Sequence, residues 1–160
     1  MQARNSVAKQ AATEIEAWLR LKQNSIAVTN VEDRPEYQSQ DVDLIWKTTK
    51  REIGVEIKSD TYSGDRNFFL ETISNKEKGT PGSFLYTSAD YVFYYFVKPK
   101  KLFVLPMPKT REWFLKNMRD FREAVTETDV GNGEYYTTVG RLVPISVLMQ
   151  NVNGVRLFQL

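Results

Sequence analysis

Two short segments of this 160-residue chain carry side chains that could do chemistry together. The segment QDVDLIW contains Asp43 between apolar neighbours, and the segment GVEIKSD contains Glu56 and Lys58. Because side chains alternate along a strand, Glu56 and Lys58 would project from one face, with their backbones about 7 Å apart. A hairpin through the KTTKRE turn would then bring Asp43 beside Glu56. The sequence therefore predicts a small acidic cluster with a lysine next to it.

The expected closeness of the two carboxylates indicates a site for a divalent cation, because like charges would otherwise repel each other. Mg²⁺ is commonly held by one or two carboxylates together with water and a substrate phosphate. Mg²⁺ or Mn²⁺ at Asp43 and Glu56 would polarise a phosphodiester and acidify a bound water. Lys58 would orient or help deprotonate that water, or stabilise the charge that develops at phosphorus. The backbone carbonyl of Ile57 points along the sheet edge and is a further candidate ligand.

The composition excludes several other kinds of catalysis. The chain has no cysteine and no histidine, so it has no thiolate nucleophile, zinc–thiolate site or imidazole base. Catalysis would have to use carboxylates, lysine, hydroxyls or a metal bound by oxygen. The net charge is only +2, so binding to nucleic acid would depend on where the basic residues lie rather than on their number.

The length and the hydropathy pattern suit one soluble domain. A chain of 160 residues can bury a single core, so we expect one domain spanning residues 1–160. No apolar run reaches the length of a transmembrane helix, and the start MQARNSVAKQ is too polar for a signal peptide. We therefore expect a cytoplasmic protein with no membrane partner, from a bacterial, archaeal or phage-infected cell.

The periodicity of apolar residues predicts an α/β or α+β fold, with a central mixed sheet flanked by helices. Segment 91–97 (YVFYYFV) is continuously apolar, which is typical of a central strand covered on both faces. The composition of segment 74–83 predicts a mobile loop. We predict helices over 6–22 and 110–125, and strands over 25–31, 41–46, 52–59, 68–73, 91–97, 102–105, 135–142 and 155–160.

The order of a helix with acids, a strand with Asp43 and a strand with Glu56-Ile57-Lys58 resembles the PD-(D/E)XK nuclease superfamily. That superfamily includes restriction endonucleases, archaeal-type Holliday junction resolvases and many phage nucleases. The similar stretch covers about residues 8–73, and Val42 stands where the family's name has proline. The resemblance implies a restriction-endonuclease-like core, with metal ligands at Asp43 and Glu56 and with Lys58 near the attacking water. It implies a Mg²⁺-dependent endodeoxyribonuclease, either selective for branched DNA or belonging to a phage or mobile element.

The same resemblance suggests further acidic residues. Junction resolvases use a glutamate of the first helix, and Glu14 best matches its spacing. Glu16 is the alternative, since it is two residues on and roughly 200° around the helix. Glu71, on the strand after the Glu56-Ile57-Lys58 motif, would be a partner of Lys58 or an additional metal ligand. An ordinary acid on a solvent-facing edge strand is the other interpretation of Glu71.

Basic residues in two places are candidate contacts for DNA phosphates, and the resemblance further implies a homodimer. We expect one group beside the acidic cluster and another in the 74–83 loop, which together would follow a phosphate backbone. An alternative is a non-catalytic nucleic-acid-binding or regulatory module on the same fold, and a third is an interaction protein with solvent-facing acids. The candidate contacts are Lys47, Lys50 and Arg51 in the first group and Lys76 and Lys78 in the second.

Overall fold

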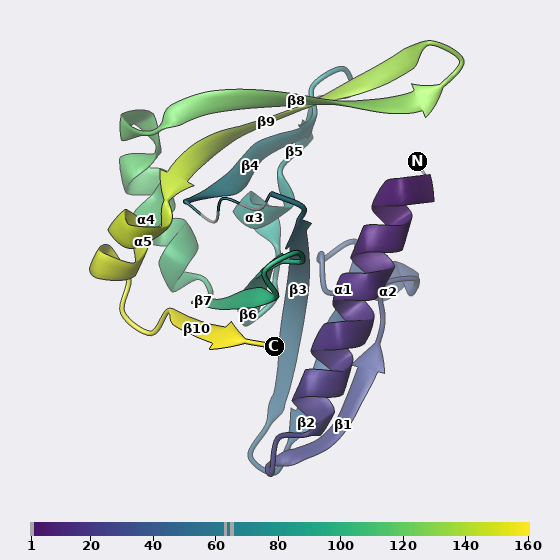
Figure 1. Ribbon diagram of the computed structural model, residues 1–160, viewed down its shortest axis with the longest axis vertical. Helices are drawn as coiled ribbons and strands as arrows, with labels where there is room; N and C mark the ends of the chain where they lie inside the picture. Colours follow the sequence, from purple (N-terminus) through teal and green to yellow (C-terminus); the bar gives the residue numbers. More distant parts are fainter. Residues whose placement is uncertain (1, 63, 65) are drawn as a thin grey trace.

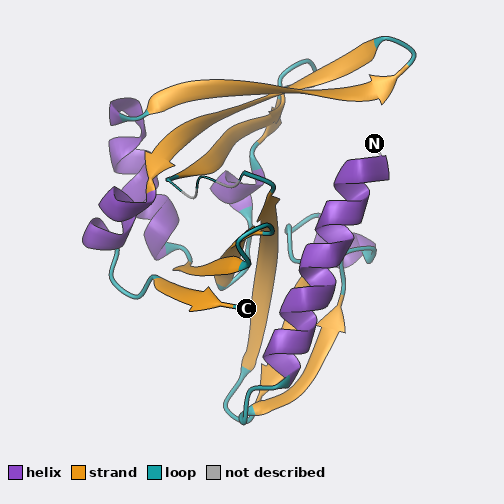
Figure 2. Cartoon of the chain, viewed as in Figure 1, coloured by secondary structure: helices purple, strands orange, loops and turns teal. Residues whose placement is uncertain are grey.

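The computed structural model describes residues 2–62, 64 and 66–160 and shows a mixed α/β fold with two sheets (Figures 1 and 2). In spatial order, the larger sheet contains β1 (Ser25–Asn30), β2 (Leu44–Thr48), β3 (Glu52–Asp60), β6 (Tyr91–Phe96), β7 (Lys101–Pro106) and β10 (Arg156–Gln159). The smaller sheet contains β5 (Thr80–Pro81), β4 (Asn67–Asn75), β9 (Glu134–Pro144) and β8 (Arg122–Gly131). Among the described strands, β3 and β6 pair in parallel and the other pairs are antiparallel, so the expected mixed central sheet is confirmed.

The helices lie on different sides of the larger sheet (Figure 1). The long helix α1 (Gln2–Arg20) runs along one face, whereas α4 (Lys109–Asn117) and α5 (Ile145–Asn151) lie beside the smaller sheet. The remaining helical segments are short: α2 (Pro35–Gln38), α3 (Ser83–Tyr86) and the 3₁₀ turn η1 (Met118–Asp120). In the part of the chain that is described, no helix is long and apolar enough to cross a membrane.

The apolar stripe of α1 decides which way the side chains of β3 face. Ala11, Ile15 and Leu19 recur every four residues, and all three are completely buried against the larger sheet. Val55 of β3 lies in the same cluster. Because side chains alternate along a strand, Glu56 must project from the opposite face of the sheet.

A second core fills the space between the two sheets and the helices α4 and α5. Strand β6 contributes to both cores, since Phe93 and Tyr95 pack toward α1 whereas Tyr94 and Phe96 pack toward Phe68 of β4. Strand β6 lies between β3 and β7 with nearly all of its side chains buried. The prediction of a central strand over 91–97 is therefore confirmed.

The predicted helix over 110–125 is wrong in its second half. Helix α4 ends at Asn117, the turn η1 follows, and Arg122–Gly131 forms strand β8. The segment REAVTETDV has β-branched residues at positions 125, 126, 128 and 130, and it pairs with β9 in the register Val125↔Val139. Pairing with β9 therefore makes this segment a strand, although Trp113 and Phe114 begin an apolar spacing that is typical of a helix.

The predicted loop over 74–83 is also more ordered than its composition suggested. After β4, a turn leads into the short strand β5, which pairs with the end of β4, and α3 begins at Ser83. Gly82 is required at this point, because a Cβ atom there would lie 2.2 Å from the carbonyl oxygen of Glu71. This close approach holds α3 against the strand that carries Glu71.

Candidate active site

The antiparallel pairing of β2 with β3 places Asp43 beside Glu56, as the sequence predicted. Leu44 is the partner of Val55, and the backbone N–H of Asp43 donates to the Val55 carbonyl at 2.8 Å. The backbone hydrogen bonds between these two segments stop at this pair. The next hydrogen bond along the same edge of β3 is made by the Asp43 side chain. Its Oδ2 atom accepts a hydrogen bond from the Ile57 N–H at 2.7 Å. This contact fixes the Asp43 carboxylate against the exposed edge of β3.

The carboxyl groups of Asp43 and Glu56 are close enough to share a hydrogen bond when one of them carries a proton. Burial and the neighbouring charge of Asp43 raise the pKa of Glu56 well above its usual range. Burial also raises the pKa of Asp43, although the hydrogen bonds from Ile57 and Glu56 oppose the shift. Glu56 is only 6% exposed, so water screens this pair poorly. The pair is therefore costly in the absence of a cation.

The backbone of Ile57 faces the same edge as the Asp43 carboxylate. The N–H and C=O groups of one strand residue point to the same side of the strand. Since the Ile57 N–H is directed at Asp43, its carbonyl also lies on that edge. Two carboxyl groups and one carbonyl oxygen thus lie just before the start of β2, where β3 continues past its last partner in β2.

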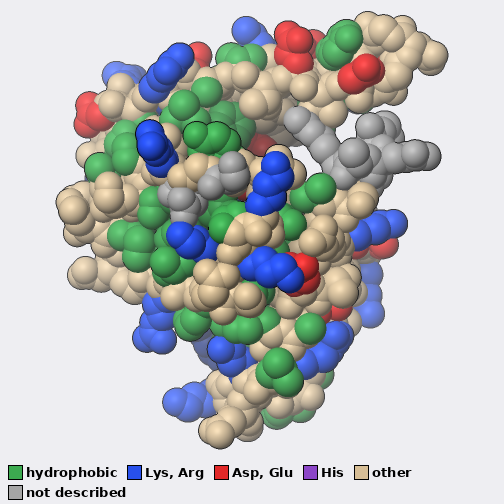
Figure 3. Space-filling model, in the orientation of Figure 1, with side chains coloured by type: hydrophobic (Ala, Val, Ile, Leu, Met, Phe, Trp, Pro, Cys, Tyr) green, Lys and Arg blue, Asp and Glu red, His purple; other side chains and the backbone are tan. Residues whose placement is uncertain are grey.

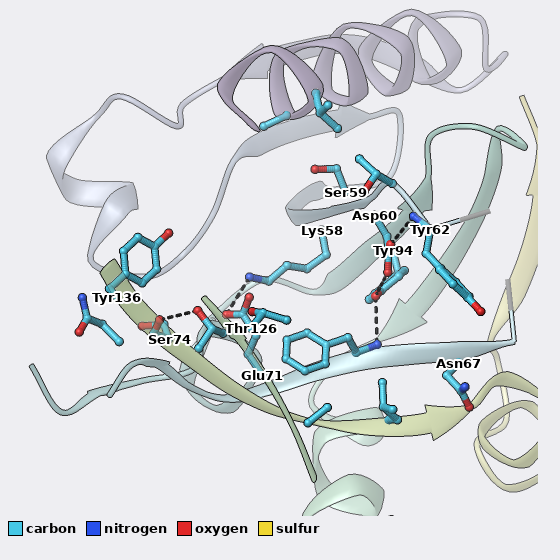
Figure 4. A pocket seen from close by; sticks show the side chains of 18 residues that line it. Lys58, Ser59, Asp60, Tyr62, Asn67, Glu71, Ser74, Tyr94, Thr126 and Tyr136 are labelled. Carbon is cyan, nitrogen blue, oxygen red and sulfur yellow. Dashed lines mark hydrogen bonds and ion pairs between the residues drawn. The ribbon is translucent and has the colours of Figure 1, made fainter. Parts of the chain in front are cut away.

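Lys58 extends from the same face of β3 as Glu56 and forms an ion pair with Glu71 of β4, with 3.3 Å between Nζ and Oε2 (Figure 4). Burial by itself would lower the pKa of Lys58, but the charges of Glu71 and Glu56 outweigh it, and the pKa is raised. The two side chains are 27% and 22% exposed. Of the alternatives for Glu71, the structure shows the contact with Lys58.

The predicted glutamates of the first helix do not join this cluster. Glu14 accepts a hydrogen bond from the Tyr95 hydroxyl and pairs with Lys100 at 3.6 Å. Tyr95 faces α1, so the sheet itself separates Glu14 from Glu56. The preference for Glu14 as a metal ligand is therefore not supported by the geometry. The apolar stripe of α1 fixes the helix rotation, and that rotation leaves Glu14 on the α1 side of the sheet.

Glu16, the alternative helical acid, is engaged near the outer strand β1. It accepts a hydrogen bond from Asn30 at 3.1 Å and lies 3.5 Å from the Arg20 guanidinium. Burial and then the charges of Asp43, Asp33 and Glu16 raise the pKa of Glu32. Among the described residues, Glu16 itself bonds to Asn30 and Arg20 and not to the acidic cluster.

Two residues near the cluster were missed in the sequence, Asp41 and Tyr86. Asp41 has a positive φ of 48°, and its charge acts on Glu56, Asp43 and Lys58. Its Oδ2 atom is buried and has no hydrogen-bond partner among the described residues. Burial, Asp41 and the charge of Glu56 raise the pKa of the Tyr86 hydroxyl to about 12. The spacing Asp41-Val42-Asp43 was the available signal for Asp41, whereas nothing local pointed to Tyr86.

The acidic cluster offers donor atoms that suit a hard cation, although it does not enclose one. In the described chain, no three acidic side chains converge closely enough to hold a metal ion by themselves. The pair Asp43 and Glu56, the Ile57 carbonyl and the unpartnered Asp41 oxygen are all oxygen donors. Mg²⁺ is typically bound by one or two carboxylates, with water and phosphate completing its coordination. The residues present therefore fit Mg²⁺ or Mn²⁺.

A cleft of about 1000 Å³ opens beside Lys58, between the two sheets. Lys58 and Glu71 line it, and Figure 4 shows the lysine reaching across from one sheet to the other. Asp43 and Glu56 do not line this cleft; Glu56 lies two residues back along β3. Lys58 is thus the member of the predicted catalytic set that a molecule in the cleft would touch.

The two groups of candidate DNA contacts lie at different distances from the cluster. Lys47 pairs with Glu52, roughly 13 Å along β3 from Glu56, so the group of Lys47, Lys50 and Arg51 is not beside the site as expected. The turn between β2 and β3 lies at the end of β3 away from the cleft (Figure 1). Lys76 and Lys78 are exposed and follow Asn75 at the cleft wall. On the face seen in Figure 3, lysine and arginine side chains are dispersed.

Searches of protein-family models, curated proteins and solved structures find nothing that matches this chain. The function is therefore inferred from the site geometry.

Proposed function

We propose that this protein is a metal-dependent DNA endonuclease that hydrolyses phosphodiester bonds at Asp43, Glu56 and Lys58. The observation that carries this proposal is the contact between the carboxyl groups of Asp43 and Glu56, which two neighbouring strands hold together. Lys58 follows on the same face and opens onto a cleft. The same set, in the same order, is what a restriction-endonuclease-like core would carry. In keeping with that resemblance we propose a homodimer that cuts two strands.

The metal ligands would be Asp43, Glu56 and the Ile57 carbonyl, with Mg²⁺ or Mn²⁺ as the ion. The bound ion would neutralise charge on the phosphate and acidify the attacking water. The hydrogen bond from the Ile57 N–H keeps the Asp43 carboxylate at the strand edge. Burial, and after it repulsion from Asp43, raises the pKa of Glu56, and a cation would relieve that repulsion.

Lys58 would act as a positive charge rather than as a base. Its pKa is raised by Glu71 and Glu56, so the ammonium form is favoured at neutral pH. An ammonium group cannot accept a proton from water, but it can position that water and stabilise negative charge developing on the phosphate oxygens. Glu71 fixes the direction of the Lys58 side chain across the cleft.

A second candidate is a nucleic-acid-binding module that does not cleave. Glu56 is nearly completely buried, and neither Glu56 nor Asp43 lines the cleft. The Lys58 ammonium is already paired with Glu71. In this alternative the acidic pair has a structural role at the edge of β3, and the protein binds DNA with or without Mg²⁺.

Incubation with linear, branched and single-stranded DNA in Mg²⁺ or Mn²⁺ tests the proposal. The wild type should cleave at least one of these DNAs, whereas Asp43→Asn and Lys58→Met should each reduce the rate by about 100-fold or more. Asp90→Asn is a matched control, because Asp90 also accepts a hydrogen bond from a β3 backbone N–H, that of Gly54 at 2.8 Å. Lys100→Met matches Lys58→Met, because Lys100 also pairs with a glutamate.

Calorimetric titration with Mg²⁺ separates the two candidates. A nuclease should bind Mg²⁺ and lose that binding in Asp43→Asn but not in Asp90→Asn. If the wild type cleaves no DNA in the panel and binds Mg²⁺ no better than Asp43→Asn, the nuclease proposal is wrong. DNA binding that persists in both variants would then support the non-catalytic module.

A further inference from the structure

The cleft beside Lys58 has a lining that differs from that of a phosphate-binding groove. It lies between the end of β3 on one side and strands β4, β9 and β8 on the other, with Val7 and Ala8 of α1 at its margin. Lys58 is the only basic side chain in the described lining, and it is already paired with Glu71. A sugar-phosphate backbone would therefore find little positive charge inside.

The carboxylate of Asp60, which also lines the cleft, has hydrogen-bond partners of its own. Asp60 accepts hydrogen bonds from the Tyr94 hydroxyl at 2.6 Å and from the backbone N–H of Tyr62 at 2.7 Å. The Tyr94 hydroxyl in turn accepts a hydrogen bond from the Phe69 N–H at 3.0 Å. These contacts compensate the Asp60 charge, so the cleft is polar without being strongly acidic.

The rest of the lining offers neutral hydrogen-bonding groups and aromatic rings. The side chains of Ser59, Asn67 and Thr126 make no hydrogen bond within the described residues, so they are available to a ligand. Tyr62 and Tyr136 lie on either side of the Lys58–Glu71 pair in Figure 4. Free amide and hydroxyl groups can bond to base edges, and aromatic rings can stack on base faces.

We propose that this cleft binds an unpaired base of the DNA substrate, next to the phosphate that Lys58 would contact. A base within a duplex can enter such a cleft only by leaving the stack, which costs the stacking and pairing free energy, whereas an unpaired base has no pairing to lose. The proposal rests on the proposed function and adds a substrate class to it: DNA with unpaired nucleotides, whether single-stranded, gapped or branched. Apart from the phosphate at Lys58, the phosphates would stay outside, where the exposed Lys76 and Lys78 follow Asn75 of the cleft wall.

Binding measured by fluorescence anisotropy in EDTA tests this substrate class without requiring cleavage. Three labelled DNAs of equal length are compared: a single strand, the same strand with abasic sites throughout, and a blunt-ended duplex. The abasic strand keeps every phosphate and lacks only bases. The wild type should bind the intact single strand about tenfold or more tighter than the other two. Equal affinity for the intact and abasic strands would overturn the proposal.

Variants at two adjacent tyrosines test whether the base binds in the cleft. Tyr136 lines the cleft, whereas Tyr135, its neighbour on β9, is 56% exposed and does not. Tyr136→Ala should weaken single-strand binding by about 5- to 150-fold, the usual range for a lost stacking contact. Tyr135→Ala and Tyr136→Phe should bind as the wild type does, since the second keeps the ring. Equal losses in Tyr135→Ala and Tyr136→Ala would show that the base does not bind in the cleft.

The outcome can be separated from that of the nuclease proposal by assaying the same proteins with Mg²⁺. Base-dependent binding that Tyr136→Ala weakens, without any cleavage, supports the cleft and refutes the nuclease. Cleavage that Lys58→Met abolishes, together with equal binding of intact and abasic strands, supports the nuclease and refutes the base-binding cleft.

Discussion

Replacement of Glu56 by glutamine should stabilise the metal-free protein, which is unusual for a change at a buried position. The Glu56 carboxyl is 6% exposed and is in contact with Asp43. At neutral pH the folded protein must therefore either keep a proton on Glu56 or hold two negative charges together, and both cost free energy. Glutamine has nearly the same shape, carries no charge and can donate a hydrogen bond to Asp43.

The gain should depend on pH in a defined direction. The pKa of Glu56 is raised well above its ordinary value of 4.5. At pH values between 4.5 and the raised pKa of the folded state, the folded protein binds a proton that the unfolded chain has released. The stability of the wild type therefore falls as the pH increases through this range. Below about pH 4.5 both states are protonated and this cost disappears. Glu56→Gln should therefore be more stable than the wild type at pH 8 and close to it near pH 4.

The magnitude follows from proton linkage, because each tenfold difference in the proton affinity of Glu56 between the folded and unfolded states costs the wild type about 1.4 kcal/mol at high pH. For a chain of this length, each kcal/mol corresponds to roughly 2–4 °C in Tm. Thermal unfolding in EDTA at the two pH values measures the effect. Glu52→Gln is the control, because Glu52 faces the same side of β3 and is exposed. A Tm of Glu56→Gln equal to or below the wild-type value at pH 8 would refute the reasoning.

Addition of Mg²⁺ should reduce the stability difference between the two proteins. At a Mg²⁺ concentration about tenfold above its Kd, binding stabilises the folded wild type by about 1.4 kcal/mol. Glu56→Gln lacks one of the two carboxylates and should gain much less. An equal Mg²⁺-induced increase of Tm in both proteins would place the ion elsewhere.

Three further substitutions test how the site is positioned. Glu14→Ala should lower the free energy of unfolding by about 1–3 kcal/mol in urea denaturation, because the buried Tyr95 hydroxyl loses its acceptor. DNA cleavage should persist, and loss of cleavage in a folded variant would show that Glu14 belongs to the active site. Tyr94→Phe should also cost about 1–3 kcal/mol, because the Phe69 N–H loses its acceptor, as urea denaturation would show. Gly82→Ala should destabilise by at least about 1–3 kcal/mol through its clash with the Glu71 carbonyl, whereas the methyl group of Gly54→Ala meets no atom closer than 3.6 Å and should cost less. Equal effects on Tm would contradict this packing.

The part of the site that the sequence predicted correctly depends on short-range rules. Strand alternation and a hairpin are sufficient to place Asp43, Glu56 and Lys58 on one face. The structure has these three residues on that face, and the register Leu44↔Val55 brings the first two into contact. The buried strand β6 was predictable for a similar reason, because a continuous apolar run suits a strand covered on both faces.

The errors arise where distant segments decide the outcome. The segment after Met118 has enough apolar residues to suggest a helix, but its pairing with β9 makes it a strand. The identity of the partner of Lys58 depends on how the second sheet packs against the first, which no local pattern specifies. Asp41 was overlooked although the predicted strand over 41–46 included it; in the structure β2 begins only at Leu44, and Asp41 precedes it with a positive φ of 48°.

The position of Glu14 shows how a family resemblance and the packing of one helix can disagree. The stripe of Ala11, Ile15 and Leu19 must face the sheet, since exposing it would forfeit about 1.5–3 kcal/mol for each large side chain. That requirement fixes the rotation of α1 and leaves Glu14 beside Tyr95, on the face of the sheet opposite Glu56. The proposed metal site therefore receives no ligand from Glu14, and its protein ligands would be Asp43, Glu56 and the Ile57 carbonyl.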